Sequence, residues 1–180
     1  MGLGRELADQ ARHLAEREPR TSANLRRAVS TAYYAIFHML GEAMAERFAA
    51  GEALERFRPS FQRAVDHSTA KAAAAEFVAL GESQRNAKKK ERNDVPEVVA
   101  TMEGVTVDDD LLQVVKALVA LQQARHSADY DLGSRFGMAE VMGFVFQAEG
   151  AFAAWERAKA RPAADSFLAT VLLWKYLRRP

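Results

Sequence analysis

LRRAVSTAYYAIFHMLGEAMAERF, residues 25–48, is the stretch that decides the fold. Its apolar residues recur at steps of three and four, which is the spacing of one face of an α-helix. That face is formed by Leu25, Val29, Tyr33, Ile36, Phe37, Leu40, Met44 and Phe48. Thr21 or Ser22 stands where it can cap the start of the helix. Because the stripe is long and strongly apolar, we expect this helix to lie at the centre of the domain.

The rest of the chain has helical spacing in almost every segment and almost no strand signals. We expect a first helix over residues 3–17, a third over 59–81, a fourth from Asp108 to about His126, a fifth capped by Ser134 and running to Pro162, and a last one that finishes at Arg178 and Arg179. These elements predict an all-α fold, an antiparallel up-and-down bundle of about five to six helices. Residues 1–160 are expected to form the bundle, and residues 161–180 a C-terminal helix that packs on it or on a partner.

Length and composition restrict the class of protein. A chain of 180 residues with 49% hydrophobic residues is expected to form one globular domain with a core of its own. The formal net charge is only +1, so any binding to nucleic acid must come from a local patch. Cysteine is absent, which excludes disulfides and thiolate metal sites. No apolar run approaches the ~18 residues of a membrane span, and no signal peptide is visible, so we expect a cytoplasmic protein without membrane contact.

Two short motifs point to a known family. Residues 26–38 read RRAVSTAYYAIFH, in which a small residue precedes a Tyr-Tyr-Ala sequence and an aromatic residue follows. Residues 125–131 read RHSADYD, which contains the pattern R-x-x-A-D-Y. Together the motifs resemble the HEPN family of helical domains, and in particular a prokaryotic branch related to HEPN toxins that are paired with minimal nucleotidyltransferases. The resemblance covers most of the chain up to about residue 160.

The resemblance implies a HEPN-like bundle that forms a homodimer through the helices carrying the arginine motif. Active members of the family are metal-independent ribonucleases that use an Arg and a His about four to six residues apart, and other members only bind RNA or nucleotides. Arg125 matches the family arginine, but the position five residues further on is Tyr130. His126 is present next to Arg125, and neighbouring helical residues point about 100° apart.

The missing histidine matters because RNA cleavage without a metal needs a base for the 2′-hydroxyl and an acid for the leaving oxygen. Imidazole can do either near neutral pH, whereas arginine holds its proton and can only stabilise charge. We therefore expect a HEPN-like module that binds RNA or nucleotide phosphates without cleaving them. The resemblance further implies a two-component toxin–antitoxin or defence system with a nucleotidyltransferase-type antitoxin as partner. The first alternative is a metal-independent endoribonuclease toxin that uses Arg125 with His126 or His38. The second is a helical dimerisation scaffold that involves no nucleic acid.

The remaining motif residues have structural and functional interpretations side by side. Asp129 can hold Arg26 or Arg27 of the second helix, and Tyr130 can pack on Tyr33 or Tyr34. Tyr33, Tyr34 and Phe37 are expected in the core or a dimer face, with base stacking as the rarer alternative. His38 is expected to be a core or groove histidine, or else a catalytic one. His13 and His67 have no partner pattern and receive no role.

One cluster of cations stands apart from the motifs. Its members are Arg85, Lys88, Lys89, Lys90 and Arg92. We expect an exposed loop or frayed helix end there, either simply solvated or gripping a phosphate backbone. No histidine and carboxylate follow the helical metal-ligand pattern H-E-x-x-H, so we expect no metal site and no cofactor.

Overall fold

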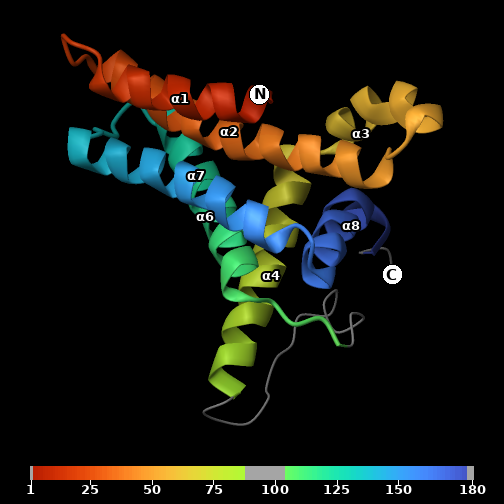
Figure 1. Ribbon diagram of the computed structural model, residues 1–180. Coiled ribbons are helices and arrows are strands. Elements are labelled where there is room, and N and C mark those ends of the chain that lie inside the picture. Colours follow the sequence, from red (N-terminus) through yellow and green to blue (C-terminus); the bar gives the residue numbers. More distant parts are fainter. Residues whose placement is uncertain (1, 88–103, 178–180) are drawn as a thin grey trace.

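The computed structural model describes residues 2–87 and 104–177, and in these it contains helices and no strand (Figure 1). The predicted all-α helical bundle is confirmed. The α-helices are α1 (Leu3–Glu16), α2 (Ser22–Phe48), α3 (Arg58–Ala64), α4 (His67–Ala87), α6 (Asp109–Tyr130), α7 (Met138–Ala158) and α8 (Pro162–Leu177), with a short 3-10 helix, η1 (Glu52–Phe57), before α3. No helix in the described ranges is long and apolar enough to cross a membrane.

Helix α2 is central, as its apolar stripe predicts. Thr21 caps it, because the Thr21 hydroxyl accepts a hydrogen bond from the Asn24 N–H at 3.1 Å. Side chains are buried well beyond the predicted stripe, since α1, α3, α6 and α7 all pack against this helix. Figure 1 shows α1 and α7 running along α2, while α4 and α6 lie side by side and cross that layer steeply. Tyr33, Ile36 and Leu40 are fully buried at the crossing.

Small residues let α1 approach α2 closely. Ala8, Ala11 and Ala15 form the buried face of α1. Gly4 continues this face, and a Cβ there would lie 2.9 Å from the Ala35 carbonyl oxygen. A larger side chain at position 4 would therefore push the two backbones apart.

The helix expected over residues 59–81 is instead two helices, so that prediction is wrong in its bounds. The chain breaks at Val65, which is extended, and α4 then starts under the carboxylate of Asp66. Asp66 accepts hydrogen bonds from the Thr69 N–H at 2.8 Å and from the Ser68 hydroxyl at 2.7 Å. Gly81 does not end the helix either, because α4 continues to Ala87.

The end of α6 and the start of α7 also differ from the predicted positions. The start of α6 lies at the predicted position, and Asp108 caps it, because its carboxylate accepts from the Leu111 N–H at 3.0 Å. Helix α6 continues past His126 to Tyr130. Ser134 does not cap the next helix: Gly137 is the N-cap of α7, and the Ser134 hydroxyl donates to Asp131 at 2.6 Å.

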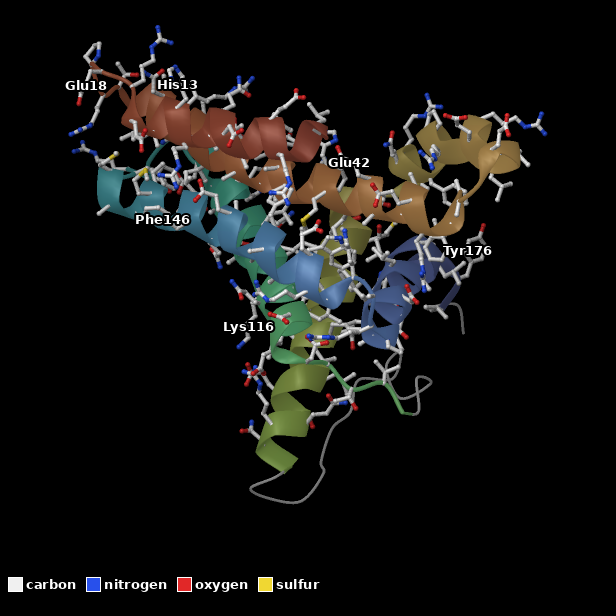
Figure 2. The ribbon with its side chains drawn as sticks, viewed as in Figure 1. His13, Glu18, Glu42, Lys116, Phe146 and Tyr176 are labelled. Carbon is white, nitrogen blue, oxygen red and sulfur yellow. The ribbon has the colours of Figure 1, made fainter. Side chains whose placement is uncertain are left out.

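Helix α8 packs on the bundle against α4. Phe167 of α8 is fully buried and meets Phe77 of α4 edge to face, with ring centroids 5.2 Å apart. Trp174 is buried within the same chain. The opposite side of α8 exposes Leu173 and Tyr176, the second of which projects from the bundle in Figure 2.

Replacing Phe167 by Ala is expected to reduce the free energy of unfolding by about 3–5 kcal/mol, because it leaves a cavity against Phe77. Chemical denaturation followed by circular dichroism measures the change. Leu173→Ala, on the exposed side of the same helix, serves as the control and should leave the midpoint almost unchanged. Equal losses for both variants would contradict the assignment of Phe167 to the core.

Candidate functional site

The arginine motif lies where the last turns of α6 meet α2. Arg125 donates a hydrogen bond from Nη2 to the Tyr34 hydroxyl at 3.0 Å, and its Nε lies 2.6 Å from Oδ2 of Asp129. The other carboxylate oxygen of Asp129 accepts from the Ser30 hydroxyl at 2.5 Å. The two predicted motifs, about a hundred residues apart in sequence, are thus joined by one polar network.

Arg125 belongs to the wall of the bundle rather than to an open cleft. Its side chain is only 15% exposed, and its Cζ atom lies 5.5 Å from the ring centroids of both Tyr34 and Tyr130. Burial lowers the pKa of Arg125, but the neighbouring Tyr34 and Asp129 raise it by more, so the guanidinium stays charged. A phosphate would have to displace Asp129 to reach it directly.

Arg26 does not pair with Asp129, which corrects the first expected contact. Its guanidinium instead donates to the carbonyls of Ala128 at 2.8 Å, Asp131 at 3.0 Å and Ser134 at 2.5 Å. These carbonyls belong to the last turn of α6 and the loop after it, where a positive charge is favourable. Arg26 is therefore the cap that ends α6.

Tyr130 does not pack on Tyr33 or Tyr34, which corrects the second expected contact. Its side chain is 64% exposed, and its ring lies over Arg125 and beside His126, with the two ring centroids 5.2 Å apart. His126 is exposed and faces away from the α2 contact. The helical step of about 100° thus separates His126 from Arg125.

His67, which received no role from the sequence, lies beside the tyrosine pair. Its Nδ1 is 2.6 Å from the hydroxyl of the fully buried Tyr33, and its ring centroid is 4.1 Å from that of Phe37 and 5.8 Å from that of Tyr34. Burial lowers the pKa of His67, and the positive charge of Arg125 lowers it further. Burial also raises the pKa of Tyr33, so at neutral pH both groups of this pair are uncharged.

A pocket opens on the neighbouring face of α2, and we call it the Arg27 pocket. It has a volume of about 240 Å³ and lies between α1 and α2. Its lining consists of Leu3, Leu7, Gln10, Arg27, Thr31, Tyr34 and His38. None of these side chains is a carboxylate. The polar groups that face the pocket are therefore cationic or neutral, and Tyr34 connects the pocket to Arg125.

The basic cluster is described only at its first residue. Arg85 is exposed at the end of α4 and forms an ion pair with Asp109. Lys88, Lys89, Lys90 and Arg92 lie outside the described residues. Within residues 2–87 and 104–177, no group of three or more histidine, aspartate or glutamate side chains is arranged to hold a metal ion.

No family model matches the sequence, and no curated protein and no solved structure matches it either.

Sequence reasoning missed Ser30 and His67. Ser30 is a polar residue one helical turn before Tyr34 and one position after Val29 of the apolar stripe, which is a usable signal for a buried hydrogen bond. His67 gives no such signal, because its contact with Tyr33 depends on how α4 crosses α2. Arg27, Tyr34 and His38 were all predicted site residues, and the structure brings them together.

Replacing Asp129 by Asn is expected to lower the free energy of unfolding by about 1–3 kcal/mol, because Arg125 loses its counter-ion while still largely buried. Urea denaturation at neutral pH measures this loss. The control is Asp9→Asn on the exposed face of α1, which should have no effect. An unchanged stability of the Asp129 variant would mean that solvent already screens the pair.

The pKa shift of His67 predicts a pH dependence of stability. Because the folded-state pKa lies below the unfolded value of 6.5, the unfolded chain binds a proton first as the pH falls. The stabilising contribution is complete above pH 6.5 and declines below it. We expect the free energy of unfolding of the wild type to fall more steeply between about pH 7.5 and 5.5 than that of His67→Gln. Parallel curves for the two proteins would refute the prediction.

Proposed function

We propose that this chain is a HEPN-like module that binds RNA or nucleotide phosphates without cleaving them, and that the Arg27 pocket is the binding site. The observation that carries the proposal is the lining of that pocket, where Arg27 and His38 flank Tyr34 and no carboxylate is present. The juxtaposition of the two family-like motifs through Tyr34 and Arg125 supports the assignment.

Each polar group of the pocket suits a phosphate oxygen. Arg27 is exposed and forms no ion pair within the described residues, so its guanidinium is available for a bidentate contact. Tyr34 accepts a hydrogen bond from Arg125, which leaves the phenolic proton free to donate outward. Thr31 adds a second hydroxyl and His38 an imidazole. Arg125 is then a positioning residue that orients Tyr34 and adds positive potential behind it.

The absence of a second proton-transfer group in the pocket favours binding over cleavage. His38 is the one imidazole in the lining. His67 is engaged with Tyr33, and His126 lies on the exposed side of α6 beside Tyr130. A base and an acid on the two sides of a phosphodiester are therefore not both provided.

A helical scaffold without nucleic acid is the second candidate function. It is favoured by the burial of Arg125 and by the ion pair with Asp129, which give the arginine motif a complete structural role. A homodimer and a nucleotidyltransferase-type antitoxin as partner are proposed from the family resemblance alone.

Arg27→Gln is expected to weaken the binding of single-stranded RNA by roughly tenfold, since one charge-assisted phosphate contact is lost. Fluorescence anisotropy with labelled RNA at about 50 mM and about 300 mM salt measures the affinity, and the salt dependence should become shallower in the variant. Arg63→Gln on α3 is the matched control, because that exposed arginine lies outside the pocket.

Two outcomes decide against the proposal. If the wild type fails to bind RNA even at low salt, the scaffold interpretation replaces it. If the protein cleaves RNA in the presence of EDTA and His38→Ala abolishes that cleavage, the module is a ribonuclease rather than a binding protein. His126→Ala and Arg125→Ala are tested in the same way, because the ribonuclease alternative uses Arg125 with either histidine. Cleavage that persists in all three variants would indicate a contaminating enzyme, and the affinity measurement then decides.

A further inference from the structure

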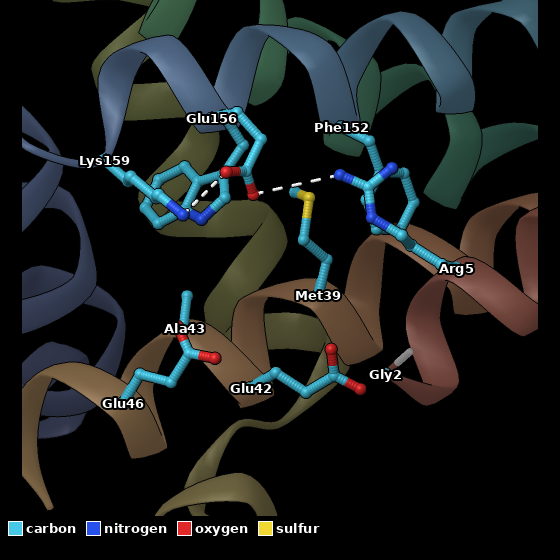
Figure 3. A pocket seen from close by; sticks show the side chains of 10 residues that line it. Gly2, Arg5, Met39, Glu42, Ala43, Glu46, Phe152, Glu156 and Lys159 are labelled. Atoms are coloured by element: carbon cyan, nitrogen blue, oxygen red, sulfur yellow. Dashed lines mark ion pairs between the residues drawn. The ribbon is translucent and has the colours of Figure 1, made fainter. Parts of the chain in front are cut away.

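A second and larger hollow lies away from the arginine motif. It has a volume of about 370 Å³ and is formed where the beginning of α1, the second half of α2 and the end of α7 meet (Figure 3). We call it the Trp155 pocket. Its volume lies within the range of sites that hold small molecules. It shares no lining residue with the Arg27 pocket.

The middle of the Trp155 pocket is apolar. Met39, Ala43, Phe152 and Trp155 contribute to the lining, and each is at most 7% exposed. These side chains offer a surface against which a short hydrocarbon segment can pack.

Trp155 also provides a polar group that the fold itself does not use. The residue is only 5% exposed, and its indole N–H donates no hydrogen bond to any part of the chain that the structure describes. The nitrogen atom itself is not fully buried and keeps some contact with solvent. Because Trp155 lines the pocket, an acceptor on a bound ligand would satisfy this donor.

Charge divides the pocket into two walls. On the α2 wall, Glu42 and Glu46 stand one helical turn apart, which is unfavourable for two like charges (Figure 3). Glu42 accepts one hydrogen bond, from the Gly4 N–H at 3.2 Å, and Glu46 makes no ion pair within the described residues. Among the described residues, no cation therefore pairs with the two carboxylates of this wall.

The opposite wall carries an excess of positive charge. Glu156 lies between two cations, with Lys159 Nζ at 2.6 Å and Arg5 Nη2 at 3.9 Å from its carboxylate oxygens. Two cations share one carboxylate, and the Trp155 N–H adds a neutral donor. In Figure 3, Met39 rises between Glu42 and the pair of Arg5 and Glu156.

From these three features we propose that the Trp155 pocket binds a small zwitterion whose ammonium and carboxylate groups are separated by a short hydrocarbon chain. The ammonium lies between Glu42 and Glu46. The carboxylate lies near Arg5 and Lys159 and accepts the Trp155 N–H. The hydrocarbon chain packs on Met39 and Phe152.

Isothermal titration calorimetry with three probes of equal chain length tests the proposal. These are 6-aminohexanoate, which has both charges, hexylamine, which has only the ammonium, and hexanoate, which has only the carboxylate. We expect 6-aminohexanoate to bind at millimolar or lower concentration and each singly charged probe to bind roughly tenfold more weakly. No heat of binding for 6-aminohexanoate at about 10 mM, or equal binding of hexylamine, would overturn the proposal.

Two variants assign the contacts. Glu46→Gln should weaken 6-aminohexanoate by roughly tenfold while leaving hexanoate unchanged, and Trp155→Phe should weaken both carboxylates while leaving hexylamine unchanged. Glu55→Gln in η1, which lies outside the pocket, is the matched control. Thermal melts without ligand establish that each variant is folded. Equal weakening by Glu46→Gln and Glu55→Gln would refute the assigned site.

Discussion

The contact between the Arg125 guanidinium and the buried face of α2 fixes how these two helices meet. A charge that is largely removed from water must keep its partners, or the folded state loses several kilocalories per mole. The partners of Arg125 are Asp129 on its own helix and Tyr34 on α2, and Ser30 of α2 completes the hydrogen bonding of Asp129. Sliding α6 by one turn would move the guanidinium by about 5.4 Å. The ion pair with Asp129 would move with the helix, but the hydrogen bonds to Tyr34 and Ser30 of α2 would be lost. These two bonds, together with the close-packed apolar side chains of α6, specify the register.

Two polar stripes run along α2, and they have different tasks. Arg26, Ser30 and Tyr34 follow one another at four-residue steps and all contact the end of α6. Arg27, Thr31, Tyr34 and His38 follow the neighbouring face and line the Arg27 pocket. Tyr34 belongs to both stripes. Its hydroxyl accepts from the structural network on one side and faces the pocket on the other, which is how a buried arginine can influence a ligand that it does not touch.

The sequence was sufficient to predict what local chemistry controls. The helical class, the central position of α2, the cap at Thr21 and the helix start at Asp108 follow from periodicity and from side chains that act within one turn. The helix end predicted at Gly81 is wrong, because the prediction used glycine as a sign of a helix end. Here the missing side chain of Gly81 leaves room for Leu112, since a Cβ at position 81 would lie 3.0 Å from Leu112 Cδ1. The motif placed Arg125 and Tyr34 in one site, but the bond from Ser30 to Asp129 and the contact of His67 with Tyr33 depend on helix crossings. No local pattern encodes those crossings.

The distribution of charge along α2 gives an independent reason to assign the two pockets. The helix dipole favours carboxylates in the first turn of a helix and cations in the last. Glu46 stands in the last turn of α2, against this preference, whereas Arg26, Arg27 and Glu42 lie further inside the helix, where the dipole has little effect. Arg26 and Glu42 have internal explanations, because one caps the end of α6 and the other accepts from the first turn of α1. Arg27 and Glu46 have none within the described residues. Both side chains are exposed, and each is a charge of its pocket lining that no other described part of the chain holds. Arg27 would then contact an anion in one pocket, and Glu46 would contact an ammonium group in the other.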